Sequence, residues 1–346
     1  MNMSIYLYEL KKLCGIRIIF IFLCFMAVKL ATTYFYYPPE YEFSKDFYRE
    51  YTDTLFGEHT AEKEQYILGE QARLEDILSR KEETESAYIR DEITLEEYID
   101  FNTEYIRAEN QLSAFNKIYE KYEYFLTVED KGPQYFYDLD VIEYLGEYGA
   151  DVLLLLFLII FGLRFWDYDR LCGMSLSVIS TPLGRIKRDN IKCAALITMT
   201  VISSLLSFIP DIISFCMRCG GEMLNMPLCS MAEFGCCGYQ LSVLGYMLLV
   251  LLVRTVWAVS MCVLLCLIYK LIINMYAGVA LSAAVILLPV MAGYGLPPEL
   301  RTVLIGSQLT GFSVLETSIP CSMLTAVIIT AAMYGIIILA AKKKRI

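Results

Sequence analysis

The chain has 346 residues, of which 57% are hydrophobic and 20% are charged, and its formal net charge is −10. This apolar content, gathered into runs of about 20 residues, excludes an ordinary water-soluble globule. The charge is unevenly divided: residues 35–148 carry 29 acidic and 11 basic side chains, a net of −18, whereas the rest carries 10 acidic and 18 basic side chains, a net of +8. The sequence therefore predicts an acidic, water-facing domain inserted between membrane-spanning segments.

Residues 1–34 are predicted to form an N-terminal helix followed by the first membrane span, over 15–33. No small-residue cleavage site follows this span, and Lys29 interrupts its apolar stretch. We interpret the segment as a retained anchor and not as a signal peptide.

Residues 35–148 are predicted to contain a helical hairpin over 60–127. Thr60 begins the first helix, residues 91–94 form the turn, and Thr94 and Glu97 have the spacing of a capping box for the second helix. At 1.5 Å per residue the second helix reaches about 50 Å. Apolar and tyrosine residues recur along it at coiled-coil spacing. These are Tyr98, Phe101, Tyr105, Ala108, Leu112, Phe115, Tyr119, Tyr122 and Leu126.

Two interpretations of this tyrosine-rich stripe stay open. It is the core of the hairpin, packed on the first helix and on residues 43–56, or it is a docking surface for a cargo or a second copy. The acidic excess also has two interpretations, because solvated helix faces are commonly acidic and a net charge of −18 also attracts cationic peptides.

Residues 149–346 are predicted to hold five further spans. Runs of this length without period-2 alternation favour helices over a barrel. The predicted fold class is an all-α membrane protein with six transmembrane helices and an external, coiled-coil-like hairpin domain between spans 1 and 2. The six predicted spans are 15–33, 149–166, 193–215, 241–268, 271–293 and 323–341.

The orientation follows from basic residues in short loops, which favour the cytoplasmic side. All the basic clusters fall on one side if both termini are inside, and the −18 domain is then outside. The basic residues are Lys11, Lys12, Arg17, Arg164, Arg170, Arg185, Lys187, Arg188, Lys192, Lys270, Lys342, Lys343, Lys344 and Arg345.

Lys29, Asp211 and Arg254 are charged residues inside predicted spans, where ionisable groups are costly and usually functional. Lys29 and Asp211 lie at similar estimated depths and could pair, although Lys29 could also extend to the outer interface. Arg254 lies near the middle of the fourth span, so it is expected to pair structurally with a neighbouring helix or to line a translocation path.

Motifs of known enzymes are missing from the sequence. It has no G-x-x-x-x-G-K-[ST], no H-E-x-x-H and no G-x-S-x-G, and its single histidine, His59, is interpreted as a turn residue. Nothing in it favours nucleic-acid binding. Five cysteines between Cys216 and Cys237 are interpreted as incidental thiols, disulfides or, least in keeping with their spacing, a metal site. An enzyme, a bound cofactor and a metal centre are therefore not expected.

A long basic loop, 167–192, separates spans 2 and 3 and is predicted to be amphipathic, with Pro182 and Gly184 breaking the element. The acidic residue after span 2, then Ser180-Thr181-Pro182-x-Gly184-Arg185, then a lysine at the next span, resembles the first cytoplasmic loop of exporter-class (type 2) ABC transporter permeases. The N-terminal Tyr8-Glu9-Leu10-Lys11-Lys12-Leu13 resembles the elbow helix of that family. Six spans and an external insert also resemble bacterial members.

The resemblance implies a permease subunit in a bacterial plasma membrane that works as a homodimer or with a sister permease. It would move an amphipathic or peptide-like substrate outward, while a separate ABC ATPase subunit binds and hydrolyses ATP. The elbow residues would be Glu9, Lys11 and Lys12, and the ATPase-coupling residues would be Asp167, Asp169, Pro182, Gly184, Arg185, Arg188 and Lys192. A membrane sensor or scaffold that binds a ligand through the hairpin is the alternative, and an intramembrane enzyme of unrecognised type is a third.

Overall fold

The computed structural model describes residues 3–34, 43–128, 132–148, 151–171, 182–234, 241–272, 274–293 and 319–343. Within these residues the secondary structure is almost entirely helical, which confirms the all-α prediction; two two-residue strands, β1 (Gly57–Glu58) and β2 (Tyr135–Phe136), pair antiparallel. The chain divides into two compact units. Unit 1 comprises 1–36, 143–218 and 245–346, and unit 2 comprises 37–142 and 219–244.

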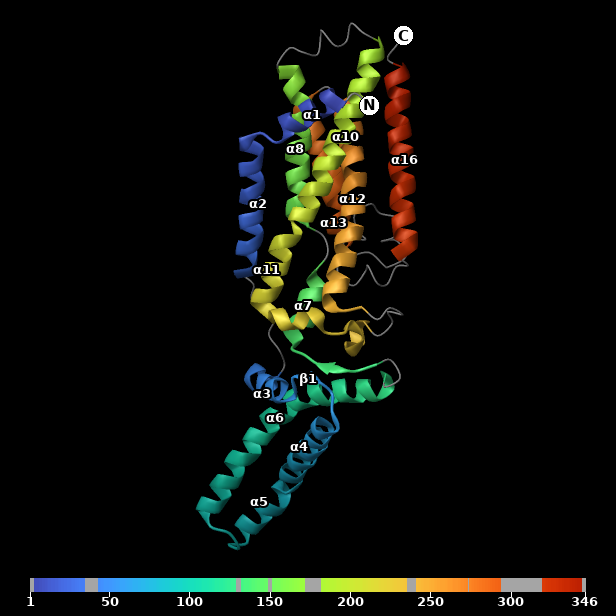
Figure 1. The fold of residues 1–346 in the computed structure, drawn as a ribbon. Helices are drawn as coiled ribbons and strands as arrows, with labels where there is room; N and C mark the ends of the chain where they lie inside the picture. Colours follow the sequence, from blue (N-terminus) through green and yellow to red (C-terminus); the bar gives the residue numbers. More distant parts are fainter. Residues whose placement is uncertain are drawn as a thin grey trace. The chain divides into compact units, whose positions relative to one another are not determined.

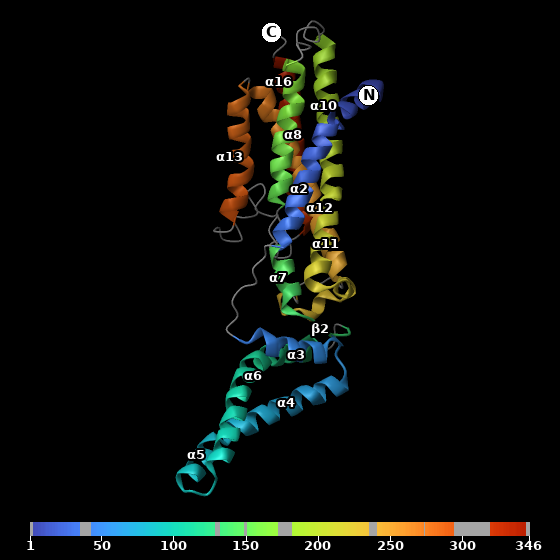
Figure 2. The ribbon, with the colours of Figure 1, turned by 90° about the vertical axis from the view of Figure 1, so that its left-hand side faces the viewer.

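Unit 1 is a bundle of apolar helices (Figures 1 and 2). In both views the N-terminus, the end of α8, the start of α10 and the end of α16 lie at the same end of this unit. Its helices are α1 (Met3–Leu13), α2 (Ile16–Tyr34), α8 (Val152–Leu171), α10 (Pro182–Leu206), α11 (Phe208–Cys219), α12 (Val243–Leu271), α13 (Met275–Gly293) and α16 (Ile319–Lys343), and it also contains most of α7 (Leu139–Glu147).

Two helical stretches are long and apolar enough to cross a membrane, Asp189–Cys219 and Val243–Leu271. A third candidate is the α1–α2 pair, which is bent by 53°. Shorter apolar helices occur at Val152–Trp166, Tyr276–Val285 and Ala326–Leu339. The described residues therefore contain two or three candidate spans, and the six-span topology stays a prediction.

The helices on either side of the basic loop extend further than predicted. The helix α8 continues to Leu171, so that Asp167 and Asp169 are helical, and α10 begins at Pro182 and runs through Gly184 without a break. Proline suits the first turn of a helix, because its missing N–H has no helical partner there. The prediction that Gly184 breaks the element was wrong. Residues 172–181 of the predicted loop lie outside the described residues.

The core of unit 1 is built from close helix pairs. The helix α1 packs against α10, and α8 packs against both α2 and α13. Leu13, the last residue of α1, is 1% exposed within this core. A side chain at Gly278 of α13 would come within 3.3 Å of the Tyr269 ring, so this glycine permits the close approach.

Unit 2 contains the predicted hairpin. The helix α6 (Leu95–Val128) packs against α3 (Lys45–Leu55), α4 (Ala61–Ser79) and α5 (Lys81–Ile89). The capping box at the start of α6 is confirmed, since the Glu97 backbone N–H donates to Thr94 Oγ1 at 3.3 Å and the Thr94 N–H donates to Glu97 Oε2 at 2.8 Å. Three short 3-10 turns complete this unit: η2 (Gly221–Asn225), η3 (Leu228–Ser230) and η4 (Ala232–Phe234).

The predicted heptad seam is only partly correct. Ala108, Phe115 and Tyr122 are buried as expected, but Leu126 is 52% exposed. The other buried residues of α6 are Gln111, Ala114, Ile118, Phe125 and Val128. The buried face is rotated because α6 contacts α3 as well as the hairpin helices, so it serves a multi-helix core and not a two-helix seam.

The single histidine is packed inside unit 2. The His59 ring lies 5.8 Å from the ring of Tyr122, 5.6 Å from Phe125 and 5.7 Å from Phe136 between centroids, and its backbone N–H donates to Gln134 O at 2.7 Å. His59 does occupy a connection between elements, yet it also contributes aromatic surface to the core. Its role as a turn residue was therefore an incomplete interpretation.

The stability of unit 2 is expected to depend on pH through Lys121. Its Nζ donates to Tyr48 Oη at 2.5 Å and to Tyr137 O at 2.9 Å. Burial lowers the pKa of Lys121 from 10.5 to about 8, against the opposing effects of Asp138 and Glu233. Between pH 8 and 10 the unfolded chain then binds more protons at this site than the folded chain does, so the free energy of unfolding should rise with pH, by roughly 1–3 kcal/mol.

Above pH 10 this gain should reverse, because burial raises the pKa of Tyr48 and keeps it protonated only in the folded state. Chemical denaturation of the full chain in detergent from pH 7 to 11 measures the profile. Lys121→Met should flatten the rise between pH 8 and 10, whereas Lys117→Met, at a site with a 45% exposed side chain, should leave it unchanged. An identical slope in Lys121→Met would contradict the assignment.

Candidate functional site

Four charged side chains meet inside unit 1. Lys29 Nζ of α2 lies 2.5 Å from Asp151 Oδ2 and 2.5 Å from Asp211 Oδ1. Asp151 precedes the first residue of α8, and Asp211 belongs to α11. The possible pairing of Lys29 with Asp211 is therefore present in the structure, and Lys29 does not extend away to solvent.

Arg254 of α12 completes this cluster. Its Nη2 lies 2.9 Å from Asp211 Oδ2, and its Nη1 lies 3.8 Å from Asp151 Oδ2. The Arg254 guanidinium carbon also lies 5.7 Å from the centre of the Tyr148 ring. Arg254, Asp151 and Asp211 are 3%, 8% and 4% exposed. We call Lys29, Asp151, Asp211 and Arg254 the charge cluster.

The local sequence explains where the cluster forms. Pro210 has no N–H, and its ring crowds the carbonyl four residues before it, so the helix is interrupted at Ser207 between α10 and α11. The Ser207 carbonyl accepts a hydrogen bond from Lys29 Nζ at 3.2 Å, and Ser207 Oγ accepts one from Arg254 Nη2 at 3.3 Å. The proline break thus supplies polar partners to both cations.

The second acid of the cluster is fixed by its place at a helix start. Asp151 Oδ1 accepts the backbone N–H of Leu154 at 2.8 Å, as an N-cap does. Two tyrosines of unit 1 anchor the other acid: Tyr144 Oη donates to Asp211 O at 2.7 Å, and Tyr148 Oη donates to Asp211 Oδ2 at 3.4 Å.

The charge cluster is electrically balanced, with two cations and two anions. Ion pairs this deeply buried contribute little net stability, because desolvation offsets their attraction, but loss of one member leaves an uncompensated charge. The cluster joins α2, α11, α12 and the start of α8, and any relative movement of these helices must rearrange it. Arg254 Nε is also buried without a hydrogen-bond partner among the described residues, which leaves a donor for another group.

Sequence reasoning found three of the four charges and missed Asp151. Asp151 was taken as part of the second span, although an aspartate directly before an apolar helical run is a recognisable N-cap. Tyr148 and Ser207 gave no comparable signal, since their role depends on the proline break and on helix packing.

The predicted coupling residues are placed as follows. Asp167 and Asp169 lie in the last turns of α8, and Pro182, Gly184, Arg185 and Arg188 lie in the first turns of α10, with side chains outside the described residues. Lys192 is 2% exposed, and its Nζ lies 5.0 and 5.3 Å from the ring centres of Phe165 and Trp166. Lys192 is therefore a buried link between α8 and α10.

A further ion pair joins helices of unit 1 near the beginning of α10. Lys270 Nζ of α12 lies 2.9 Å from Asp189 Oδ2 of α10 and donates to Ile337 O of α16 at 3.2 Å. The lysine between predicted spans 4 and 5 is thus brought to the beginning of α10.

The predicted elbow residues lie on α1. Glu9 is 5% exposed and pairs with Lys12 at 3.0 Å, whereas Lys11 is exposed. Tyr6 Oη lies 2.7 Å from Thr198 Oγ1, which fixes α1 against α10. The helix α1 is thereby held to α10 by a hydrogen bond between two hydroxyl groups.

The cysteines between 216 and 237 are described in part. Cys216 and Cys229 are free thiols, Cys219 Sγ donates to Asp140 O at 3.4 Å, and Cys236 and Cys237 lie outside the described residues. The described part of the chain contains no group of three or more His, Cys, Asp or Glu side chains that could hold a metal ion.

Comparison with known proteins identifies no relative: no family model, no curated protein and no solved structure matches the chain.

Proposed function

We propose that this protein is the permease subunit of an ABC exporter in a bacterial plasma membrane. It dimerises with itself or a sister permease, recruits a separate ATPase subunit through 167–192, and moves an amphipathic or peptide-like substrate outward. The acidic domain then lies outside the cell, between the first two of six spans.

The observation that carries this proposal is the bend between α1 and α2 together with the packing of α1 on α10. The helix α1 is bent by 53° from α2, and it packs along α10, the helix that begins within the proposed coupling segment. A lever at the membrane surface must be stiffly joined to the spans that it moves. The Tyr6–Thr198 contact and the buried Lys192 provide such joints.

The charge cluster is a second observation that supports a bundle whose helices move relative to one another. Four helical segments share one balanced set of charges, and a low-dielectric interior favours a small number of discrete pairings over continuous sliding. We assign to Lys29, Asp211 and Arg254 the role of an ion-pair latch: their ion pairs hold one arrangement of the helices and exchange partners when the helices shift.

Charge reversal at the start of α10 tests ATPase recruitment. In Arg185→Glu/Arg188→Glu, the ATPase subunit that copurifies with the protein from its native membrane should fall at least tenfold, because a cationic docking surface becomes acidic. Quantitative mass spectrometry of mild-detergent purifications measures the ratio.

The control for this test is Lys117→Glu, a charge reversal on an exposed face of unit 2. It should leave the ATPase ratio unchanged. Full ATPase recovery with the double variant would contradict the coupling role of 167–192.

The alternative, a sensor or scaffold, is favoured by one observation: unit 2 has its own hydrophobic core around Tyr48, Leu74 and Phe115, as a ligand-binding ectodomain would. Repeated crosslinked purifications without any ATPase would favour this function over transport.

A further inference from the structure

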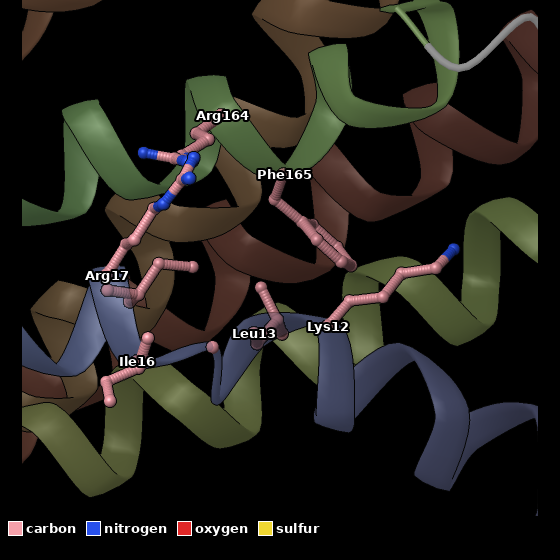
Figure 3. A pocket seen from close by; sticks show the side chains of 8 residues that line it. Lys12, Leu13, Ile16, Arg17, Arg164 and Phe165 are labelled. Atoms are coloured by element: carbon pink, nitrogen blue, oxygen red, sulfur yellow. The ribbon is translucent and has the colours of Figure 1, made fainter.

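A cavity of about 280 Å³ lies in unit 1 where α1 bends into α2 and the end of α8 approaches (Figure 3). Its wall contains three cationic side chains from three different helices: Lys12 of α1, Arg17 of α2 and Arg164 of α8. Among the residues that the structure describes, no acidic side chain lines it. We call this cavity the elbow pocket; its lining residues are Lys12, Leu13, Gly15, Ile16, Arg17, Ile18, Arg164 and Phe165.

The two arginines form the binding feature of the elbow pocket. Their guanidinium groups point toward one another in Figure 3, although they carry the same charge. No carboxylate among the described side chains pairs with Arg17 or Arg164. Two guanidinium groups so placed present a set of forked donors that suits one shared oxyanion, such as a phosphate.

Lys12 has a different part in the elbow pocket. Its ammonium points away from the arginines, and it pairs with Glu9 at 3.0 Å. It adds positive potential at the other end of the cavity while it holds α1 in shape. The start of α2, at Gly15 and Ile16, also lines the cavity, and the positive end of a helix dipole favours an anion there.

The rest of the wall is apolar. Leu13, Ile16, Ile18 and Phe165 line it, and Ile16 is 83% exposed. The outward surface of α2 continues this apolar character, since Phe20 is 67% exposed and Leu23 is 58% exposed. A ligand with an anionic head and a hydrocarbon tail matches both parts of this surface, whereas a small soluble anion matches only the arginines.

We propose that the elbow pocket binds the phosphate of an anionic phospholipid. Arg17 and Arg164 hold the phosphate, and an acyl chain follows the apolar outer surface of α2. The site lies beside the basic N-terminal region, where the positive-inside rule and the anionic inner leaflet act together. This inference rests on the proposed function in treating α2 as a membrane span whose N-terminal end faces the cytoplasm, and it needs no ATPase.

Native mass spectrometry tests the proposal on the full chain. The protein is purified in detergent with equal amounts of phosphatidylglycerol and phosphatidylcholine of the same acyl chains. The wild type should retain phosphatidylglycerol at least tenfold over phosphatidylcholine. Arg17→Gln/Arg164→Gln should lose most of this preference, because each lost charged hydrogen bond corresponds to roughly a tenfold change.

Two matched variants separate the site from general charge and from misfolding. Lys11→Gln removes a neighbouring positive charge outside the elbow pocket and should change the lipid ratio less than twofold. Arg17→Lys/Arg164→Lys keeps the charge but loses the fork, so it should retain a reduced preference and an unchanged melting temperature.

Inorganic phosphate at 10 mM, added to the same samples, distinguishes the source of the anion. Retained phosphatidylglycerol supports the phospholipid site. Displacement of phosphatidylglycerol by phosphate would overturn the lipid assignment and would instead assign the arginine pair to a soluble phosphate. Equal retention of both lipids by the wild type, or a full preference in the Gln/Gln variant, would overturn the site itself, whatever the ATPase experiment shows.

Discussion

Asp211→Asn is expected to lower the free energy of unfolding by about 3–5 kcal/mol. The substitution keeps the shape of the side chain but removes one of the two negative charges that face Lys29 and Arg254, at 2.5 and 2.9 Å. Two buried cations would then share Asp151 alone. Denaturation of the full chain in mixed detergent micelles, followed by circular dichroism, measures the change.

A double-variant cycle shows whether charge balance is the cause. Asp211→Asn/Arg254→Gln restores a neutral cluster of Lys29 with Asp151, so its cost should fall at least 1 kcal/mol below the sum of the two single variants. Additive costs would mean that these residues act independently, and the latch assigned to the charge cluster would lose its basis.

Phe115→Ala is expected to lower the free energy of unfolding of unit 2 by about 3–5 kcal/mol. Phe115 is 1% exposed, and its ring lies 5.3 Å from that of Tyr51 in an edge-on arrangement. The substitution leaves a cavity in the core shared by α3, α4 and α6. Hydrogen exchange of the amides of α6 reports on this unit separately from the helices of unit 1.

Leu126→Ala is the matched comparison, because the heptad pattern predicts both residues on one buried seam. Leu126 is 52% exposed in the structure, and its truncation should cost less than about 0.5 kcal/mol. If both variants lose a similar free energy of unfolding, the two-helix coiled coil is the correct description and the multi-helix core is wrong.

Much of the local structure follows from the sequence. Gly15, Thr60 and Thr94 mark helix starts, and the structure has α2, α4 and α6 beginning directly after these residues. Such signals are readable because capping effects involve only neighbouring residues. Apolar run length was equally informative: the predicted fourth span at 241–268 is observed as α12, Val243–Leu271.

The sequence by itself determined that the chain is helical, that apolar helices of membrane-spanning length are present, and that Lys29, Asp211 and Arg254 carry unusual charges in apolar surroundings. Only the tertiary structure decided that Asp151 joins them, that Lys192 is buried beneath two aromatic rings, and that Arg17 faces Arg164. The physical reason is that helical periodicity and hydrophobicity act over a few residues, whereas charge partners are chosen by packing between helices that are more than 100 residues apart, as Lys29 and Asp151 are.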